Sequence, residues 1–291
     1  MKFNTYNVPN VIAEIGCNHK GQLRIAKQLI HSAALSGVKF VKFQKRSNKE
    51  LLSKEQYNSP HPNPMHSYGK TYGEHREFLE FNIKQHQELK LYCEELGVCY
   101  SSSVWDVSSA KEIISLQPDF IKVPSACNNH FPLLRELRDN YSGSVHISFG
   151  MTTKEEEIEV VNFFEEKKQA KRLVLYACTS AYPVPFDDVC MLEIIRINDS
   201  FKDKVSSFGF SGHHLGIAID IAAYTLGVNW IERHFTLDRT WKGTDHSASL
   251  EPTGLRKLAR DLKATHKALK FKSSDVLDIE IYQREKLKYK K

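Results

Sequence analysis

The sequence lacks the hydrophobic segments that direct a chain into or across a membrane. No apolar run in its 291 residues approaches the roughly 20 residues that a membrane-spanning helix needs. The segment from Met1 to Pro9 has no apolar stretch typical of a signal peptide. Cys-x-x-Cys pairs are also missing, and the six cysteines lie scattered in apolar or strand-like contexts. We therefore expect free thiols, a cytoplasmic location and no membrane partner.

Signatures of nucleotide and nucleic-acid binding are missing as well. No Gly-x-Gly-x-x-Gly follows the first strand-like run, which argues against a dinucleotide-binding sheet. The net charge is +6, but a good part of it comes from the tail, residues 283–291, and not from a basic stripe interleaved with aromatic residues. We therefore expect no nucleic-acid partner. Without repeats or low-complexity linkers, the sequence predicts one domain over residues 1–291 with a solvated basic tail.

Short β-rich runs alternate with amphipathic helical runs along almost the whole chain. This alternation in a chain of this length predicts a (β/α)8 TIM barrel, with a doubly wound open sheet as the alternative. The expected strands are 11–15, 40–43, 98–102, 120–123, 145–148, 173–176, 207–210 and 230–235, and the expected helices include 23–36, 85–96, 109–116, 154–166 and 252–269.

One long connection interrupts this rhythm, from about residue 45 to residue 77. It is rich in proline, asparagine and glycine, which predicts an ordered loop. The loop leaves the carboxyl end of the second strand, and barrel active sites lie at that face. Long loops on compact barrels usually carry function. The sequence therefore places this loop beside the candidate active site.

Two histidines, His213 and His234, end two consecutive strand-like runs that are joined by a helix-like stretch, 216–227. A strand–helix–strand unit predicts parallel neighbouring strands, so the two imidazoles converge at one end of the sheet. Such a pair can hold one divalent metal in an open catalytic site. The spacing alone is equally compatible with two unrelated surface histidines.

Other polar residues also gather where the expected strands end. Lysines, serines and helix N-termini on one face suit a phosphate and a carboxylate. Each residue type has a plainer interpretation: the lysines can point outward, the serines can cap helices, and Glu14 or Glu232 can serve as ion-pair partners. The residues are Glu14, Asn18, Lys42, Gln44, Ser101, Ser102, Ser103, Lys122, Ser125, Ser148, Thr179, Ser180, Tyr182, Ser211, Glu232 and Asp245.

These segments resemble the sialic acid synthase family, and they follow the family order over most of the chain. Several of these segments are weak evidence for the family when each is taken alone. Together with the segment Glu-Arg-His-Phe-Thr, they are highly specific for it. The segments are VIAEIGCNH (11–19), VKFQ (41–44), IKVPS (121–125), ISFGM (147–151), CTSAYP (178–183), FSGH (210–213), IERHFTLDR (231–239), GTD (243–245) and SLEP (249–252).

The resemblance implies a (β/α)8 barrel enzyme that condenses phosphoenolpyruvate with an N-acetylmannosamine-type sugar to give a nonulosonic acid. It implies a divalent ion, Mn²⁺ or Mg²⁺, with His213 and His234 as protein ligands. Glu14 matches an acid near the reacting carbons, and Asp245 is expected to handle a proton at the new hydroxyl. The positions that meet phosphoenolpyruvate are Lys42, Ser103, Lys122, Ser125, Ser148 and Ser211; those that meet the sugar are Gln44, Ser180, Tyr182 and Asp245.

The chain departs from the family pattern in two places. Many members continue into an antifreeze-like domain that supplies an arginine to the sugar, whereas this sequence ends soon after the expected barrel. Lys70, His75 and Arg76 of the long loop are the expected substitutes. The family often has an acidic residue two positions after Ser125, where it meets sugar hydroxyls, but this chain has Cys127. The identity of the acceptor sugar therefore stays open.

Two other functions remain as alternatives at this stage. A metal-dependent sugar isomerase or aldolase would use the same barrel without consuming phosphoenolpyruvate. A non-catalytic sugar-binding barrel is expected to have lost the metal pair or the strand-end lysines, and Lys42, Lys122, His213 and His234 are all present. A homo-oligomer, in which the loop meets a neighbouring barrel, is the expected assembly.

Overall fold

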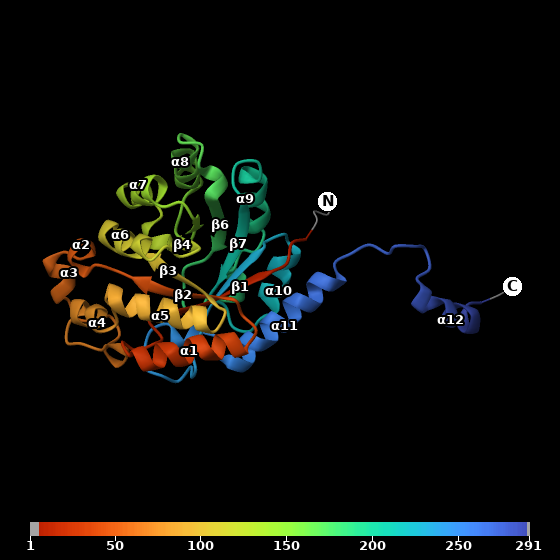
Figure 1. Ribbon diagram of the computed structural model, residues 1–291, viewed down its shortest axis with the longest axis horizontal. Coiled ribbons are helices and arrows are strands. Elements are labelled where there is room, and N and C mark those ends of the chain that lie inside the picture. The colour runs from red at the N-terminus through yellow and green to blue at the C-terminus, as the bar shows by residue number, and fades with distance from the viewer. Residues whose placement is uncertain (1–5, 290–291) are drawn as a thin grey trace.

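Eight parallel strands close into a barrel in the computed structural model, which describes residues 6–289 (Figure 1). Strands β1 and β8 also pair in parallel and close the circle. The predicted (β/α)8 barrel is therefore confirmed, and the open sheet is excluded. The predictions about a signal peptide and about a basic tail include residues 1–5 and 290–291. These residues lie outside the described part of the chain. The strands are β1 (Asn10–Gly16), β2 (Phe40–Lys45), β3 (Cys99–Val104), β4 (Phe120–Val123), β5 (Ser144–Ser148), β6 (Leu173–Cys178), β7 (Ser207–Gly212) and β8 (Trp230–His234).

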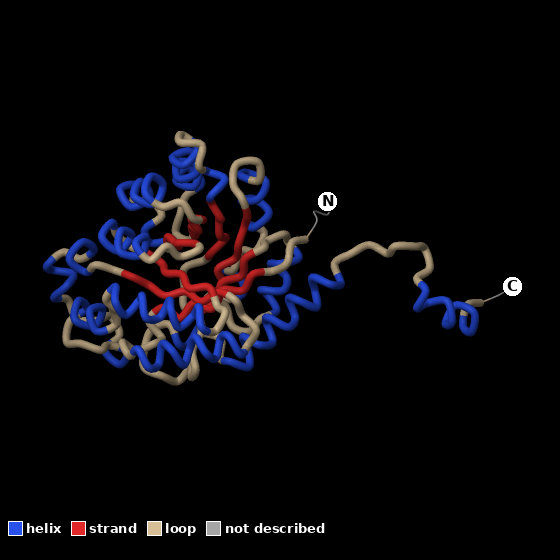
Figure 2. Tube along the Cα trace, viewed as in Figure 1, coloured by secondary structure: helices blue, strands red, loops and turns tan. Residues whose placement is uncertain are grey.

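Helices surround the barrel and separate its strands along the chain (Figure 2). Each predicted helix is present, with ends that shift by one or two residues. Of the surrounding helices, α7 and α9 were not predicted from the sequence, because both have short apolar faces on polar sequences. The surrounding helices are α1 (Leu23–Leu35), α5 (Ile83–Glu95), α6 (Val107–Ser115), α7 (Phe131–Asn140), α8 (Lys154–Glu165), α9 (Glu193–Phe201), α10 (Ala218–Thr225) and α11 (Pro252–Ala268).

The long connection after β2 is ordered, and it contains short helices: α2 (Asn48–Leu51), α3 (Lys54–Asn58) and α4 (Tyr72–Phe78). Ser53 and Thr71 begin α3 and α4 with capping boxes, in which side chains satisfy the free N–H groups of the first turn. The loop also reaches the connection after β8, because the Tyr68 hydroxyl donates to the carbonyl of Lys242. This contact holds the loop over the carboxyl ends of the strands.

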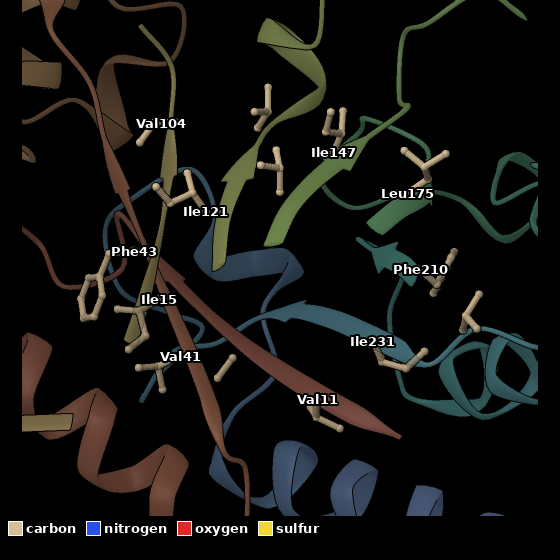
Figure 3. Close-up of a cluster of buried hydrophobic side chains, with 14 of the residues drawn as sticks. Val11, Ile15, Val41, Phe43, Val104, Ile121, Ile147, Leu175, Phe210 and Ile231 are labelled. Carbon is tan, nitrogen blue, oxygen red and sulfur yellow. The ribbon is translucent and has the colours of Figure 1, made fainter. Parts of the chain in front are cut away.

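Alternate strand residues point outward and form the main core between barrel and helices. Figure 3 shows side chains of this layer, among them Val41 and Phe43 of β2 and Ile231 of β8. Helix residues such as Leu29 and Leu258 complete the layer. Because strand side chains alternate between faces, the residues between these positions must point into the barrel. The functional side chains occupy those inward positions.

An aromatic layer fills the lower part of the barrel. Phe40, Phe120 and Trp230 come from strands that are not neighbours, yet their ring centroids lie 4.9–6.1 Å apart. His146 stacks on Phe120 at 4.1 Å and meets the Tyr176 hydroxyl through Nδ1 at 2.8 Å. These rings exclude water below the polar residues above them. The inward-facing polar groups therefore lie on an apolar floor, where unpaired charge is costly.

Gly209 of β7 has no side chain, and the ring of Tyr176 occupies the space beside it in the aromatic layer. An added Cβ at Gly209 would lie 2.4 Å from a carbon of the Tyr176 ring, which is far inside van der Waals contact. We expect Gly209→Ala to lower the free energy of unfolding by about 1–3 kcal/mol, the usual cost of overpacking. Urea denaturation measures the change. Gly254→Ala in α11 is the control, since its Cβ would meet Leu250 at an ordinary 3.4 Å. Equal stability of both variants would contradict this packing.

The chain leaves the barrel after α11. Residues 278–287 form α12 (Asp278–Leu287), which lies away from the barrel in Figure 1. Part of the expected solvated tail is thus helical, although no residue of α12 is buried. No helix among residues 6–289 is long and apolar enough to cross a bilayer.

Candidate active site

A polar cavity of about 250 Å³ opens at the carboxyl ends of the strands. Its lining comes from every strand of the barrel or from the residues that follow it. Most of the residues predicted from the sequence are brought together here: Glu14, Lys42, Gln44, Ser103, Lys122, Ser125, Ser148, Ser180, Tyr182, Ser211, His213 and His234. Lys70, Arg76 and Asp245 do not line this cavity. The same is true of four members of the predicted strand-end set: Asn18, Ser101, Ser102 and Thr179.

Lys42 of β2 is buried and points into the barrel, which excludes the outward-pointing alternative. Its Nζ donates to Ser103 Oγ at 2.6 Å and forms an ion pair with Glu14 of β1. Glu14 lies opposite Lys42 in the parallel register and also accepts a hydrogen bond from Gln44 Nε2 at 2.9 Å. Glu14 is therefore both an ion-pair partner and a cavity residue.

Lys122 of β4 forms the matching pair on the other side. Its Nζ donates to Glu232 Oε2 at 3.2 Å and lies 3.4 Å from the centre of the Tyr176 ring. Glu232 also accepts from Ser211 Oγ at 3.1 Å and lies 4.0 Å from Lys42. The sequence interpretation of Glu232 as a partner for a lysine inside the barrel is confirmed. Glu232 connects the two lysines into one charged layer.

Burial and ion pairing shift the pKa values of the two glutamates in this layer in opposite directions. Burial raises the pKa of Glu14 above its ordinary value, although Lys42 and His234 act to lower it. Burial acts in the same direction on Glu232, but Lys122 and Lys42 hold the pKa of Glu232 at about 2. Burial also lowers the pKa of Lys122. Glu232 is thus ionised at neutral pH, while Glu14 holds a proton more readily than an ordinary glutamate does.

His213 and His234 lie side by side, as β7 and β8 are parallel neighbours. Their ring centroids are 5.5 Å apart, and both rings line the cavity. The Nδ1 atom of His213 lies 3.0 Å from the Thr179 carbonyl, which can only accept, so Nδ1 carries the hydrogen and Nε2 keeps its lone pair. Burial, reinforced by His234, lowers the pKa of His213 to about 3. This imidazole is therefore neutral, as a metal ligand must be.

The histidine pair fits an open metal site. Nδ1 of His234 is buried without a hydrogen-bond partner among residues 6–289, and Asp245 Oδ2 lies 3.8 Å from it. Within the same part of the chain no three His, Cys, Asp or Glu side chains converge on a metal position. Two imidazoles would thus leave most coordination positions to substrate oxygens and water, which is typical of catalytic sites.

Asp245 and Tyr182 stand next to the histidines. Burial acts to raise the pKa of Asp245, but His234, the Thr244 hydroxyl and a nearby arginine bring it below its ordinary value. Asp245 is therefore an ionised carboxylate beside the cavity. The Tyr182 ring lies 4.3 Å from His213 and 5.7 Å from His234, and about half of the residue is exposed. This ring forms one wall at the cavity mouth.

The cavity serines do not cap helices, which was the plainer alternative. Ser125 Oγ accepts from the N–H of Gly150 at 2.9 Å. A Cβ at Gly150 would come within 2.3 Å of Ser180 Oγ and 2.8 Å of Ser125 Oγ, so only glycine leaves room for these hydroxyls. Ser148 and Ser211 complete the cavity from β5 and β7. Hydroxyl donors thus surround the two lysines.

The cations of the long loop differ in their surroundings. Lys70 is exposed, and its backbone N–H donates to Glu74. Arg76 is buried beside Trp105, whose ring centre is 5.4 Å from the guanidinium carbon. Trp105 itself lines the cavity, and the sequence reasoning did not include it. Its position directly after β3 was the available signal, because aromatic residues at strand ends often form substrate walls.

Cys127 is buried in the main core and does not line the cavity. Burial raises the pKa of its thiol to about 11. The neighbouring Asn128 is engaged with the Ser148 carbonyl at 2.9 Å and with Thr152 at 2.6 Å. The cavity surface here is formed by Ala126. Cys127, where the family often has an acidic residue, therefore lies behind the cavity wall and does not face the cavity.

Comparisons with known proteins agree with this geometry. A family model described as the NeuB family matches residues 29–274. The chain is 39% identical over 277 residues to the N-acetylneuraminate-9-phosphate synthase of Homo sapiens, covering 95% of this chain and 76% of that protein. It is 35% identical over 261 residues to the N,N'-diacetyllegionaminic acid synthase of Campylobacter jejuni, covering 89% and 77%.

A solved structure shows the same fold. The crystal structure of N-acetylneuraminic acid (sialic acid) synthetase from Leptospira borgpetersenii, in complex with citrate, matches with a TM-score of 0.80 and 26% identity over 98% of this chain and 94% of that one. The family match and the sequence identity to these synthases lead to the same conclusion. The chain is an enzyme and belongs to the NeuB family, the sialic acid synthases.

Proposed function

We propose that this enzyme condenses phosphoenolpyruvate with an open-chain N-acetylmannosamine-type sugar, giving a nonulosonic acid and inorganic phosphate. The observation that carries the proposal is the cavity itself. Two buried lysines, Lys42 and Lys122, share it with serine hydroxyls and with the pair His213 and His234. Phosphoenolpyruvate needs cations for its phosphate and carboxylate, and the sugar aldehyde needs an electrophilic activator.

The charged layer binds phosphoenolpyruvate. Lys42 and Lys122 are held in place by Glu14 and Glu232, so little side-chain freedom is lost when the anion arrives. Serine hydroxyls from several strands donate the remaining hydrogen bonds. The apolar floor below this layer strengthens these contacts, because water does not screen them from that side.

His213 and His234 would hold the divalent ion, Mn²⁺ or Mg²⁺. When bound there, such an ion supplies Lewis-acid polarisation of the aldehyde oxygen. Tyr182 lies against both imidazoles and orients the sugar chain at the cavity mouth. Gln44, which is fixed by its hydrogen bond to Glu14, offers the sugar an amide at the opposite wall.

The reaction forms one carbon–carbon bond and breaks one carbon–oxygen bond. C3 of phosphoenolpyruvate attacks the aldehyde carbon, and the former aldehyde oxygen takes up a proton. Water adds to C2 and gives a hemiketal phosphate, which loses inorganic phosphate by cleavage of the C2–O bond. Glu14 stands beside Lys42 with a raised pKa, so it can orient the water and exchange its proton. The proton that the added water loses balances the proton that the former aldehyde oxygen takes up, and Asp245 beside His234 can accept it and pass it on.

Isotope labelling tests this reaction directly. With phosphoenolpyruvate labelled by ¹⁸O at the bridging C2 oxygen, we expect labelled phosphate to appear only when a suitable sugar and Mn²⁺ are present. The sugar panel is N-acetylmannosamine, its 6-phosphate, mannose and a 6-deoxy diamino sugar. An isomerase or aldolase would convert sugars without any phosphate release. Absence of phosphate release with the whole panel would overturn the proposal, and unlabelled phosphate would overturn the C–O cleavage.

The enzyme is further proposed to act in the cytoplasm as a homo-oligomer. The oligomer is supported by large apolar side chains that are exposed after α11, such as Ile279 at 85% and Leu287 at 71%. Light scattering of the purified full chain measures its mass in solution. A monomer at micromolar concentration would contradict the assembly without affecting the proposed reaction.

A further inference from the structure

Arg233 of β8 is one of the largest side chains that are fully buried, with only 1% of the residue exposed. Its neighbours in the strand, Glu232 and His234, line the cavity. Because strand side chains alternate between faces, Arg233 points to the outer side of the barrel, as Ile231 does in Figure 3. A charge in this apolar layer is costly unless it is paired and hydrogen-bonded. The contacts of Arg233 should therefore reveal why a cation is held there.

The hydrogen bonds of the Arg233 guanidinium go to the segment that follows β7. Nη2 donates to the carbonyl of His214 at 2.5 Å, and Nη1 donates to the carbonyl of Gly216 at 2.8 Å. Nη1 also forms an ion pair with Asp220 in the first turn of α10, and it lies 3.1 Å from His214 Nε2. The side chains of His214 and Asp220 are themselves completely buried. A single side chain of β8 thus holds the connection between β7 and α10.

The backbone pairing of β7 with β8 stops just before the two cavity histidines. The register of the two strands runs to Gly212 opposite Arg233, and His213 and His234 are the next residue on each strand. From that point the guanidinium of Arg233 continues the connection, because it binds the carbonyl of the residue directly after His213. The contact therefore joins the backbones that carry the two imidazoles, whose ring centroids lie 5.5 Å apart.

The two imidazoles differ in how their rings are held. Nδ1 of His213 lies 3.0 Å from the Thr179 carbonyl and is fixed by it. Nδ1 of His234 is buried without a hydrogen-bond partner among residues 6–289. The position of the His234 ring relative to His213 therefore depends mainly on the two backbones. Ligands of a functional metal site must stay within roughly 0.5 Å of their productive positions, so a contact that joins these backbones matters for the metal.

Stability alone is a poor explanation for the ion pair between Arg233 and Asp220. Replacement of a buried ion pair by apolar residues of similar volume is often neutral or even stabilising, because the desolvation cost of both charges disappears. A guanidinium has a different advantage here. Its planar group donates to several acceptors in fixed directions, which an apolar side chain cannot do. The contacts of Arg233 with two carbonyls and one carboxylate use this property.

We propose that Arg233, with Asp220 as its counter-ion, is a positioning residue for the divalent metal ion. It fixes the segment after β7 onto β8 and so sets the separation of His213 and His234. The inference rests on the metal site of the proposed function, and it adds a residue that does not line the cavity. Loss of the guanidinium should weaken metal binding although both ligands remain. Binding of phosphoenolpyruvate should change little, because Glu232 lies within the paired part of β8.

Calorimetric titration of the purified full chain tests the inference. It gives the Kd for Mn²⁺ without substrate and, after treatment with a chelator, the Kd for phosphoenolpyruvate. Arg233→Met should weaken Mn²⁺ binding by about tenfold to 100-fold, as loss of a residue that orients metal ligands usually does, and change the Kd for phosphoenolpyruvate by less than about threefold. Arg138→Met is the control: Arg138 of α7 is also buried and donates to the Phe163 carbonyl at 3.0 Å. This control should lose stability and keep the wild-type affinity for Mn²⁺.

A double variant, Asp220→Asn with Arg233→Met, keeps the test decisive if Arg233→Met alone does not fold. It removes both charges of the pair, so no unpaired charge remains in the apolar layer. Circular dichroism identifies the temperature range in which each variant is folded, and the titrations are done within it. Wild-type affinity for Mn²⁺ in a folded Arg233 variant would overturn the inference alone and leave Arg233 with a purely structural role. A wild-type enzyme that does not bind Mn²⁺ would overturn the metal site itself, and the inference with it, so the two failures are distinguishable.

Discussion

Alanine in place of His213 or His234 is expected to abolish turnover and to leave the barrel folded. Each substitution removes one of the two imidazoles that converge at the carboxyl ends of β7 and β8. Loss of residues that merely support metal ligands already costs 10–100-fold in affinity, so loss of a ligand should weaken Mn²⁺ binding by more than about 100-fold. Isothermal titration with Mn²⁺ measures this directly, and phosphate release measures the consequence.

A matched control is His146→Gln. His146 also points into the barrel, but it belongs to the aromatic layer below the cavity, where it stacks on Phe120. This variant is expected to lose stability and to bind Mn²⁺ with unchanged stoichiometry. The metal assignment would be wrong if enzyme treated with a chelator kept full activity, or if His213→Ala bound Mn²⁺ as tightly as the wild-type enzyme.

The sequence predicted the barrel and most of the cavity for a definite physical reason. Strand residues alternate between two faces, so residues such as Lys42 between Val41 and Phe43 had to lie on the opposite side from the apolar core. The carboxyl ends of parallel strands meet on one rim, which brings Lys122 and His213 together although they are far apart in the sequence.

What the sequence did not predict depends on contacts between distant segments. The register of β1 against β2 decides that Glu14 pairs with Lys42, and no local pattern specifies a register across a long loop. The short helices of that loop have too few residues for a periodic apolar face, although capping residues such as Ser53 and Thr71 mark where two of them begin. The burial of Arg76 beside Trp105 is likewise a property of the folded chain, because the two residues belong to different segments.

The two lysine–glutamate pairs explain how one cavity can bind the trianion phosphoenolpyruvate and still keep its lysine charges compensated in the free enzyme. Each lysine has a carboxylate partner in the free enzyme, so neither ammonium is left bare above the aromatic floor. The partners differ, because Glu232 is held ionised by two lysines while burial favours the protonated form of Glu14. Arrival of phosphoenolpyruvate therefore needs little rearrangement. The lysines can turn toward the new anion, and Glu14 is the carboxyl that takes up the balancing proton.

Methionine at Lys42 or Lys122 keeps the side-chain volume and removes this anion-binding charge. Loss of a buried charge-assisted contact costs about 2–4 kcal/mol, which predicts a fall in kcat/KM for phosphoenolpyruvate of about 30-fold to nearly 1,000-fold. Lys45→Met is the matched control: Lys45 lies on the same strand and pairs with Glu112 at 3.2 Å, but it faces away from the cavity. Steady-state phosphate release at saturating sugar gives the values. A change below about threefold in Lys42→Met, or an equal loss in Lys45→Met, would show that the ammonium of Lys42 does not bind the substrate.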